Sequence, residues 1–140
     1  MKRASLILAS LRHAFLREPM PLPPGSYWLS LHGSVPDLEA PDATEARYPG
    51  YARVAMPLDA AHWTPSYDPD RLAGECMNAV RIEFPWCESG EPVRVSHWCL
   101  LTGPGASSPA DYAGEFETPF EVAPNRRPTF EPGDLIIEEI

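Results

Sequence analysis

The sequence predicts an all-β domain, an antiparallel β-sandwich or jelly roll with one short N-terminal helix. Apolar and polar residues alternate with a period of two in six short segments between residues 26 and 140. Eighteen prolines, each of which removes a backbone donor and fixes φ, make long helices unfavourable over most of the chain. The length of 140 residues suits one domain. We therefore expect a single domain over residues 1–140, with a helix at 3–18 and the β-sandwich at 26–140.

Residues 3–18 form the expected helix. Leu8, Leu11 and Phe15 recur at i, i+3 and i+7 on one face, and the prolines that begin at Pro19 end the helix. Two interpretations stay open. The helix is either an arm that docks on a neighbouring protein or an element packed on its own sheet. We favour the packed helix slightly, because most amphipathic helices bury their apolar face within their own domain.

The expected strands follow in chain order, separated by segments rich in proline, glycine and charged residues. The strands are expected at residues 26–32, 50–56, 80–84, 93–101, 115–122 and 135–140. Residues 33–50 and 57–75 are expected to be long polar loops, the second of which contains Trp63. Strict alternation along 93–101 places Trp98 on the more polar face of its strand, opposite Val95.

Charge narrows the range of partners. The net charge is −9, and the sequence pI is about 4.8. This balance disfavours nucleic-acid binding, which needs clustered Lys and Arg, and disfavours an anionic membrane surface. No apolar run in the sequence is long enough to span a bilayer. Such a composition suits a protein on the outside of a larger assembly.

No segment carries a catalytic, cofactor-binding or metal-binding motif. The three cysteines, Cys76, Cys87 and Cys99, are odd in number and lack a C-x-x-C pair, so they predict neither a disulfide framework nor a zinc site. A reducing compartment during synthesis follows from that usage. The strand glutamates alternate with phenylalanines, which is typical of a solvated strand face more than of a glycosidase carboxylate pair. We expect a protein that is not an enzyme and has no cofactor.

Three tryptophans are candidate contact residues together with Leu8, Leu11 and Phe15. Trp28 and Trp98 fall on the more polar faces of their strands, and Trp63 lies in an expected loop. Aromatic rings on a β-sandwich can pack on a protein partner or stack on a sugar. The pattern does not separate the two, so a glycan-binding β-sandwich module remains an alternative.

Five stretches carry a resemblance to a known family. They read YWLSLHG at 27–33, GYAR at 50–53, NAVRIEFP at 78–85, VSHWCLL at 95–101 and EPGDL at 131–135. In this order they resemble a family of small tailed-bacteriophage virion proteins labelled tail-fibre-like. One departure is Trp98-Cys99, where that family tends to have Phe-Gly.

The resemblance implies a structural protein of the virion, synthesised in the host cytoplasm. A receptor-reading fibre usually needs a long stalk or trimeric repeats, and the sequence shows no internal repeat. We therefore prefer a capsid cement or decoration protein on the outer capsid surface. Such a protein would bind and stabilise the shell of the major capsid protein, and we expect it to be a homodimer. A phage tail or tail-fibre component is the alternative.

Overall fold

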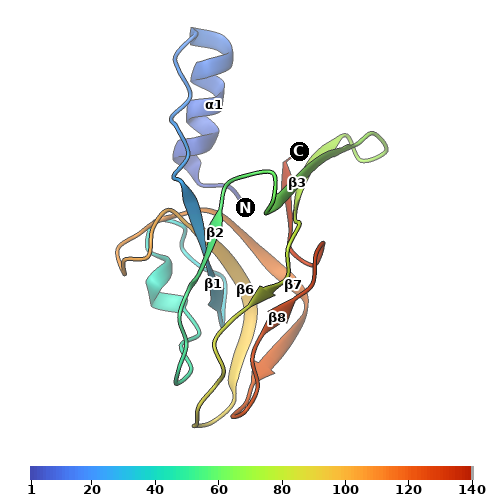
Figure 1. Cartoon of the computed structure of the whole chain (residues 1–140). Coiled ribbons are helices and arrows are strands. Elements are labelled where there is room, and N and C mark those ends of the chain that lie inside the picture. The colour runs from blue at the N-terminus through green and yellow to red at the C-terminus, as the bar shows by residue number, and fades with distance from the viewer. Residues whose placement is uncertain (140) are drawn as a thin grey trace.

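Nine strands, all paired antiparallel, make up most of the regular secondary structure in the computed structural model, which describes residues 1–139 (Figure 1). They form a sandwich-like body with the helix α1 (Ala4–Leu16) at one end. The prediction of an antiparallel β-sandwich with one short N-terminal helix is confirmed.

One layer of the sandwich is a four-stranded sheet of order β2-β1-β6-β7. Its strands are β1 (Ser26–His32), β2 (Val54–Pro57), β6 (Val93–Leu101) and β7 (Ala110–Val122). Two smaller sheets face it, of order β3-β4-β9 and β5-β8. Their strands are β3 (Trp63–Asp68), β4 (Ala73–Asn78), β5 (Ile82–Glu83), β8 (Thr129–Phe130) and β9 (Ile136–Glu139).

The main core lies between these layers. Leu29 and Leu31 of β1 pack there with Phe84, Phe130 and Leu135 from the smaller sheets and their flanks. A second, smaller cluster lies on the other face of the large sheet. It consists of Cys99, Leu101, Ala110 and Ala113, and Trp28 and Leu38 pack against it. Both faces of the large sheet are therefore covered, and polar residues in β1 and β6 are buried.

A β-bulge between Val95 and His97 shifts the register of β6 against β7. Two residue steps along β6, from Val95 to His97, face five along β7, and the alternation of β6 reverses there, so Trp98 joins Val95 on the core side. The prediction that Trp98 lies on the polar face is wrong, because sequence periodicity does not reveal the bulge. The buried indole lies over Gly114, where an added Cβ would stand 2.3 Å from the ring carbon Cζ2.

The expected loop at 57–75 is wrong as well. It holds the whole of β3 and the start of β4, which form a hairpin. Trp63 opens β3, and its buried indole donates a hydrogen bond from Nε1 to the Pro57 carbonyl at 3.1 Å. Local sequence patterns do not predict this strand, because it contains Pro65. A proline is compatible with β3 because it is an edge strand that needs only one row of ladder bonds.

Other boundaries differ by a few residues. Residues 50–53 precede β2 instead of belonging to it, and β5 has only two residues. β7 begins at Ala110, five residues before the predicted start. The loop at 33–50 contains a short 3₁₀ helix, η1 (Pro41–Thr44).

Replacing Gly114 with alanine tests the packing of the indole. The added Cβ forces either Trp98 or β7 to shift, and we expect Gly114→Ala to cost about 2–3 kcal/mol of unfolding free energy. Gly25→Ala is the matched control, because a Cβ there meets nothing within 4 Å and the change should stay below about 1 kcal/mol. Urea denaturation measures both. Equal midpoints for the two variants would contradict this account of Gly114.

Candidate docking surface

Residues 1–25, here called the arm, are fixed to the body at both ends. The Met1 ammonium donates to the Ala113 carbonyl at 2.7 Å, and the Arg3 amide donates to the Asp111 carbonyl at 2.9 Å. The Arg3 guanidinium also pairs with the Asp111 carboxylate at 2.8 Å. At the other end, the Gly25 carbonyl accepts from the Leu58 amide at 3.1 Å. These anchors hold the base of the arm on β7 and beside β2.

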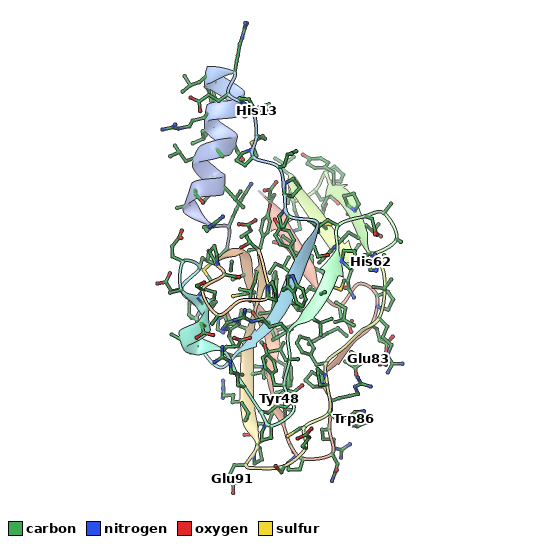
Figure 2. All side chains as sticks on the ribbon, turned by 60° about the vertical axis from the view of Figure 1, so that its left-hand side comes forward. His13, Tyr48, His62, Glu83, Trp86 and Glu91 are labelled. Carbon is green, nitrogen blue, oxygen red and sulfur yellow. The ribbon has the colours of Figure 1, made fainter. Side chains whose placement is uncertain are left out.

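Between its anchors the arm stands away from the body (Figures 1 and 2). No residue of α1 is buried. The preferred interpretation, a helix packed on its own sheet, is therefore wrong. The direction in which the helix points is set by the contacts of residues 1–3 and 25 with the body. The local sequence pattern does not reveal these contacts.

The apolar face of α1 is exposed. Leu11 is 51% exposed and Phe15 79%, and Ile7 and Leu8 are exposed to a similar degree as Leu11. With roughly 100° per residue, these four positions form one stripe along the helix. The half-buried positions Leu6, Ala9 and Ser10 lie on the opposite side. The predicted contact residues Leu8, Leu11 and Phe15 thus share one uncovered surface.

The helix ends in a compact turn. Arg17 takes a left-handed conformation with φ of 60°, and its amide donates to the Arg12 carbonyl. The His13 ring nitrogen Nδ1 lies 2.8 Å from the Glu18 carbonyl oxygen, and Arg12 faces the Glu18 carboxylate at 3.7 Å. Figure 2 shows His13 well away from the body. Arg12, His13 and Glu18 thus make their contacts within the turn at the end of the helix.

A groove of about 680 Å³ opens between the large sheet and the β3-β4-β9 sheet. Its floor is apolar and includes Tyr27, Leu58, Trp63, Tyr112 and Ile137. Among the described residues that line it, the charged ones are the carboxylates Asp59, Glu75 and Glu139, and none is Lys or Arg. The base of the arm adjoins this groove, because Lys2 bridges to Tyr112 and pairs with Glu139.

The three predicted tryptophan contacts have different surroundings. Trp63 and Trp98 are buried in the core, and Trp28 is half-buried against the second cluster. Trp28 also lines a hollow of about 570 Å³, together with Arg47, Tyr48 and Arg53. Trp86, which follows the strand at 82–83, is 55% exposed, and the Arg127 guanidinium lies 5.1 Å from its ring centre. Figure 2 places Trp86 far from the arm. The sequence signal that could have identified Trp86 as exposed is its position directly after Pro85, beyond the end of the strand.

The GYAR stretch fastens the loop at 33–50 to the sheet. Arg53 donates two hydrogen bonds to the Glu45 carboxylate, at 2.9 and 2.8 Å, and the Tyr51 hydroxyl donates a third at 2.6 Å. Arg53 also donates to the carbonyls of Pro104 and Gly105. Burial opposes ionisation of Glu45, whose side chain is 1% exposed. The hydrogen bonds from Arg53 and Tyr51 outweigh burial and hold the pKa of Glu45 below its ordinary value.

The NAVRIEFP and EPGDL stretches meet in space. The Asn78 amide nitrogen donates to the carbonyls of Val80 and Glu131 at 2.9 and 3.0 Å. Its oxygen accepts from the Leu135 amide at 2.9 Å. Asn78 is buried, so this side chain satisfies three backbone groups that water does not reach. It ties the end of β4 to the turn before β9.

His32 is a buried histidine on the second face of the sheet. Its ring nitrogens lie 2.7 Å from the Ser30 hydroxyl and 2.9 Å from the Thr44 hydroxyl. Burial lowers the pKa of His32 from 6.5 to about 4, and Glu45 opposes this effect while Arg53, His97 and Arg47 add to it. The imidazole is therefore neutral at pH 7 and belongs to the structure of the sheet.

Removing Arg53 tests the Glu45 contact. Arg53→Met leaves a buried carboxylate with only Tyr51 and the exposed Arg47 beside it, and we expect a loss of about 3 kcal/mol in unfolding free energy. The control is Arg81→Met, whose exposed pairs with Glu83 and Glu131 are worth at most about 1 kcal/mol. Chemical denaturation at neutral pH compares the two. A cost no larger than that of the control would show that the contact does not stabilise the fold.

His32 predicts a loss of stability in mild acid. Its pKa is lower in the folded than in the unfolded protein, so its contribution is complete above pH 6.5 and falls as the pH drops towards 4. Between pH 7 and pH 4.5 we expect a loss of about 2–3 kcal/mol from this group. His32→Gln should flatten that part of the stability profile, while His13→Asn on the arm should not. An unchanged slope in His32→Gln would assign the acid sensitivity to other groups.

Within residues 1–139 no group of three or more His, Cys, Asp or Glu side chains is placed to hold a metal ion. The cysteines in that part of the chain are free thiols, and Cys87 and Cys99 are buried. No helix in the described residues has the length and apolar character needed to cross a membrane. The exposed stripe of α1 and the groove beside it are two apolar surface features at the same end of the molecule.

Comparison with known proteins gives one family. A family model described as podophage GP4 fiber I protein gp80 matches residues 6–138. No curated protein matches the chain significantly. The match covers almost the entire arm and both layers of the sandwich. It confirms the resemblance to tail-fibre-like virion proteins and fits the tail-fibre alternative better than capsid cement. The chain belongs to the podophage fiber I protein gp80 family and is a structural protein of the bacteriophage virion.

Proposed function

We propose that this protein is a non-catalytic fibre component of the phage tail, and that the arm is its assembly surface. The observation that carries the proposal is the family match, which spans 133 residues (6 to 138) and whose description names a fibre protein. Capsid cement was the preferred function on the sequence alone because the chain has no stalk repeats. A small subunit without repeats can still be part of a fibre if it joins other chains.

The exposed apolar side chains support an assembly role for the arm. Eight of the thirteen large hydrophobic residues that are exposed in residues 1–139 lie on the arm: Met1, Ile7, Leu8, Leu11, Phe15, Leu16, Met20 and Leu22. A soluble monomer scatters such residues singly, whereas a concentration on one projecting element marks an interaction surface. Burying each of these side chains fully would contribute about 1.5–3 kcal/mol.

A structural role also accounts for the charged groups with perturbed ionisation. Glu45 and Arg53 hold a loop to the sheet, and His32 fills a buried position beneath that loop. Glu45 and Arg53 border a hollow of about 570 Å³, but the Glu45 side chain is only 1% exposed because Arg53 and Tyr51 bind its carboxylate. Several copies of the protein on one particle would strengthen its attachment, because several weak contacts sum to a strong one.

Immunogold labelling of intact particles tests the location. With antibody against this chain, we expect gold at the tail, where fibres attach. An antibody against the major capsid protein on parallel grids is the control and should label the head. Gold spread over the head with the first antibody would refute the fibre proposal and restore the cement interpretation. Separated heads and tails, probed with the same antibody, give an independent measurement.

A further inference from the structure

We propose that the α1 stripe of one copy seats in the groove of a second copy, so that the protein assembles with itself by exchanging arms. The stripe is Ile7, Leu8, Leu11 and Phe15, and the groove lies between the large sheet and the β3-β4-β9 sheet. This inference deepens the proposed assembly role of the arm by naming its partner. It concerns the purified protein and does not depend on where the protein sits in the particle.

Charge selects a second copy as the occupant. Residues 1–25 contain four Lys and Arg and one Glu, which gives +3. Residues 26–140 contain the other seven Arg and nineteen Asp and Glu, which gives −12, and the two parts add to the total of −9. Lys2 and Arg3 already pair with Glu139 and Asp111 of their own body. The projecting residues 4–25 carry the remaining +1, from Arg12, Arg17 and Glu18. This projecting segment is attracted to the acidic body of another copy, whereas two acidic bodies repel each other.

The groove matches the stripe in detail. Its floor offers the aromatic and aliphatic side chains of Tyr27, Trp63 and Ile137, and its three charged lining residues are acidic. The stripe is apolar, and on a helical projection Arg12 borders it on the side of Leu8. Insertion of an apolar helix face into an apolar groove, with opposite charges around the contact, is a common mode of helix recognition.

The arm is not packed in the groove of its own body. Its first three residues are held on β7 and its last residue beside Leu58, and between them α1 runs away from the body (Figure 1). The groove nevertheless begins at the base of the arm, since Tyr112 and Glu139 contact Lys2. Arm and groove therefore lie at the same end of the molecule. A two-fold pair can then exchange arms reciprocally, and a closed ring can pass each arm to the next copy.

The mass of the purified protein gives the first test. One chain has a mass of 15.5 kDa, and light scattering should give a multiple of this mass that falls on dilution. Leu11→Glu should give the monomer mass at every concentration, because it places a charge in the stripe. Leu22→Glu is the matched control, since Leu22 is on the arm and 93% exposed but lies outside the helix. This control should assemble like the unchanged protein.

Cys76 reports occupancy of the groove itself. It lines the groove and is partly exposed, whereas Cys87 and Cys99 are buried. A thiol reagent such as Ellman's reagent should modify Cys76 more slowly as the protein concentration rises, about fivefold more slowly for a two-fold pair at a total concentration of roughly ten times the dissociation constant. In Leu11→Glu the rate should not depend on concentration. At concentrations below the dissociation constant, circular dichroism and thermal melting should match in all three proteins, because Leu11 is not buried in the fold.

Three results would overturn the inference. The unchanged protein could remain monomeric at high concentration, which would assign the arm to a different virion protein. The assembly could survive in Leu11→Glu, which would place the contact elsewhere. Cys76 could keep its full reactivity in the assembled protein, which would leave the groove empty. None of these results would alter the particle location measured by immunogold labelling, so the two proposals fail separately.

Discussion

Both faces of the central β1 and β6 strands are covered, and this constraint shapes most of the molecule. A sheet buried on one side only would leave Ser30, His32 and Cys99 in water. Here the loop at 33–50 lies over them, so a segment without regular ladder bonds must be held down by side chains. Arg53 and Tyr51 supply that hold through Glu45. A buried charge is costly unless it is fully paired, so this one contact makes the position of the whole loop specific.

The sequence predicted those elements whose signals are local. The alternation in 26–32 and 93–101 gave β1 and β6 with their observed bounds, and the proline run gave the end of α1 to within two residues. The predictions failed where a distant contact decides. A bulge in β6 turned Trp98 inward, and an edge position made Pro65 compatible with a strand. In the same way, the exposure of α1 follows from anchors on β7, more than a hundred residues away in sequence.

Of the candidate site, the sequence predicted the helix face but not the groove, because the pattern of the helix face is local. Helical spacing identified Leu8, Leu11 and Phe15 as one face, and the structure shows that face uncovered. Strand alternation predicted that Trp98 is a contact residue, and an expected loop predicted the same for Trp63, but both fill the core, whereas Trp86, which was not predicted, is exposed. The groove was beyond sequence reasoning, since its lining comes from six strands and one connecting segment. The GYAR and NAVRIEFP stretches carried the resemblance to the family. In the structure, their side chains hold a loop and a strand end in place.

The anchoring of the arm has a consequence for the order of events during translation. Residues 1–16 are translated roughly a hundred residues before their partners at 111–113, and Lys2 precedes its partner Glu139 by 137 residues. Synthesis proceeds at about 5–20 residues per second, so the arm exists for many seconds before the strand that anchors it, β7, has been made. A lone helix of 13 residues is only marginally stable in water, so during this time the segment is largely unstructured. The apolar face of α1 is therefore held in place only after β7 has been made.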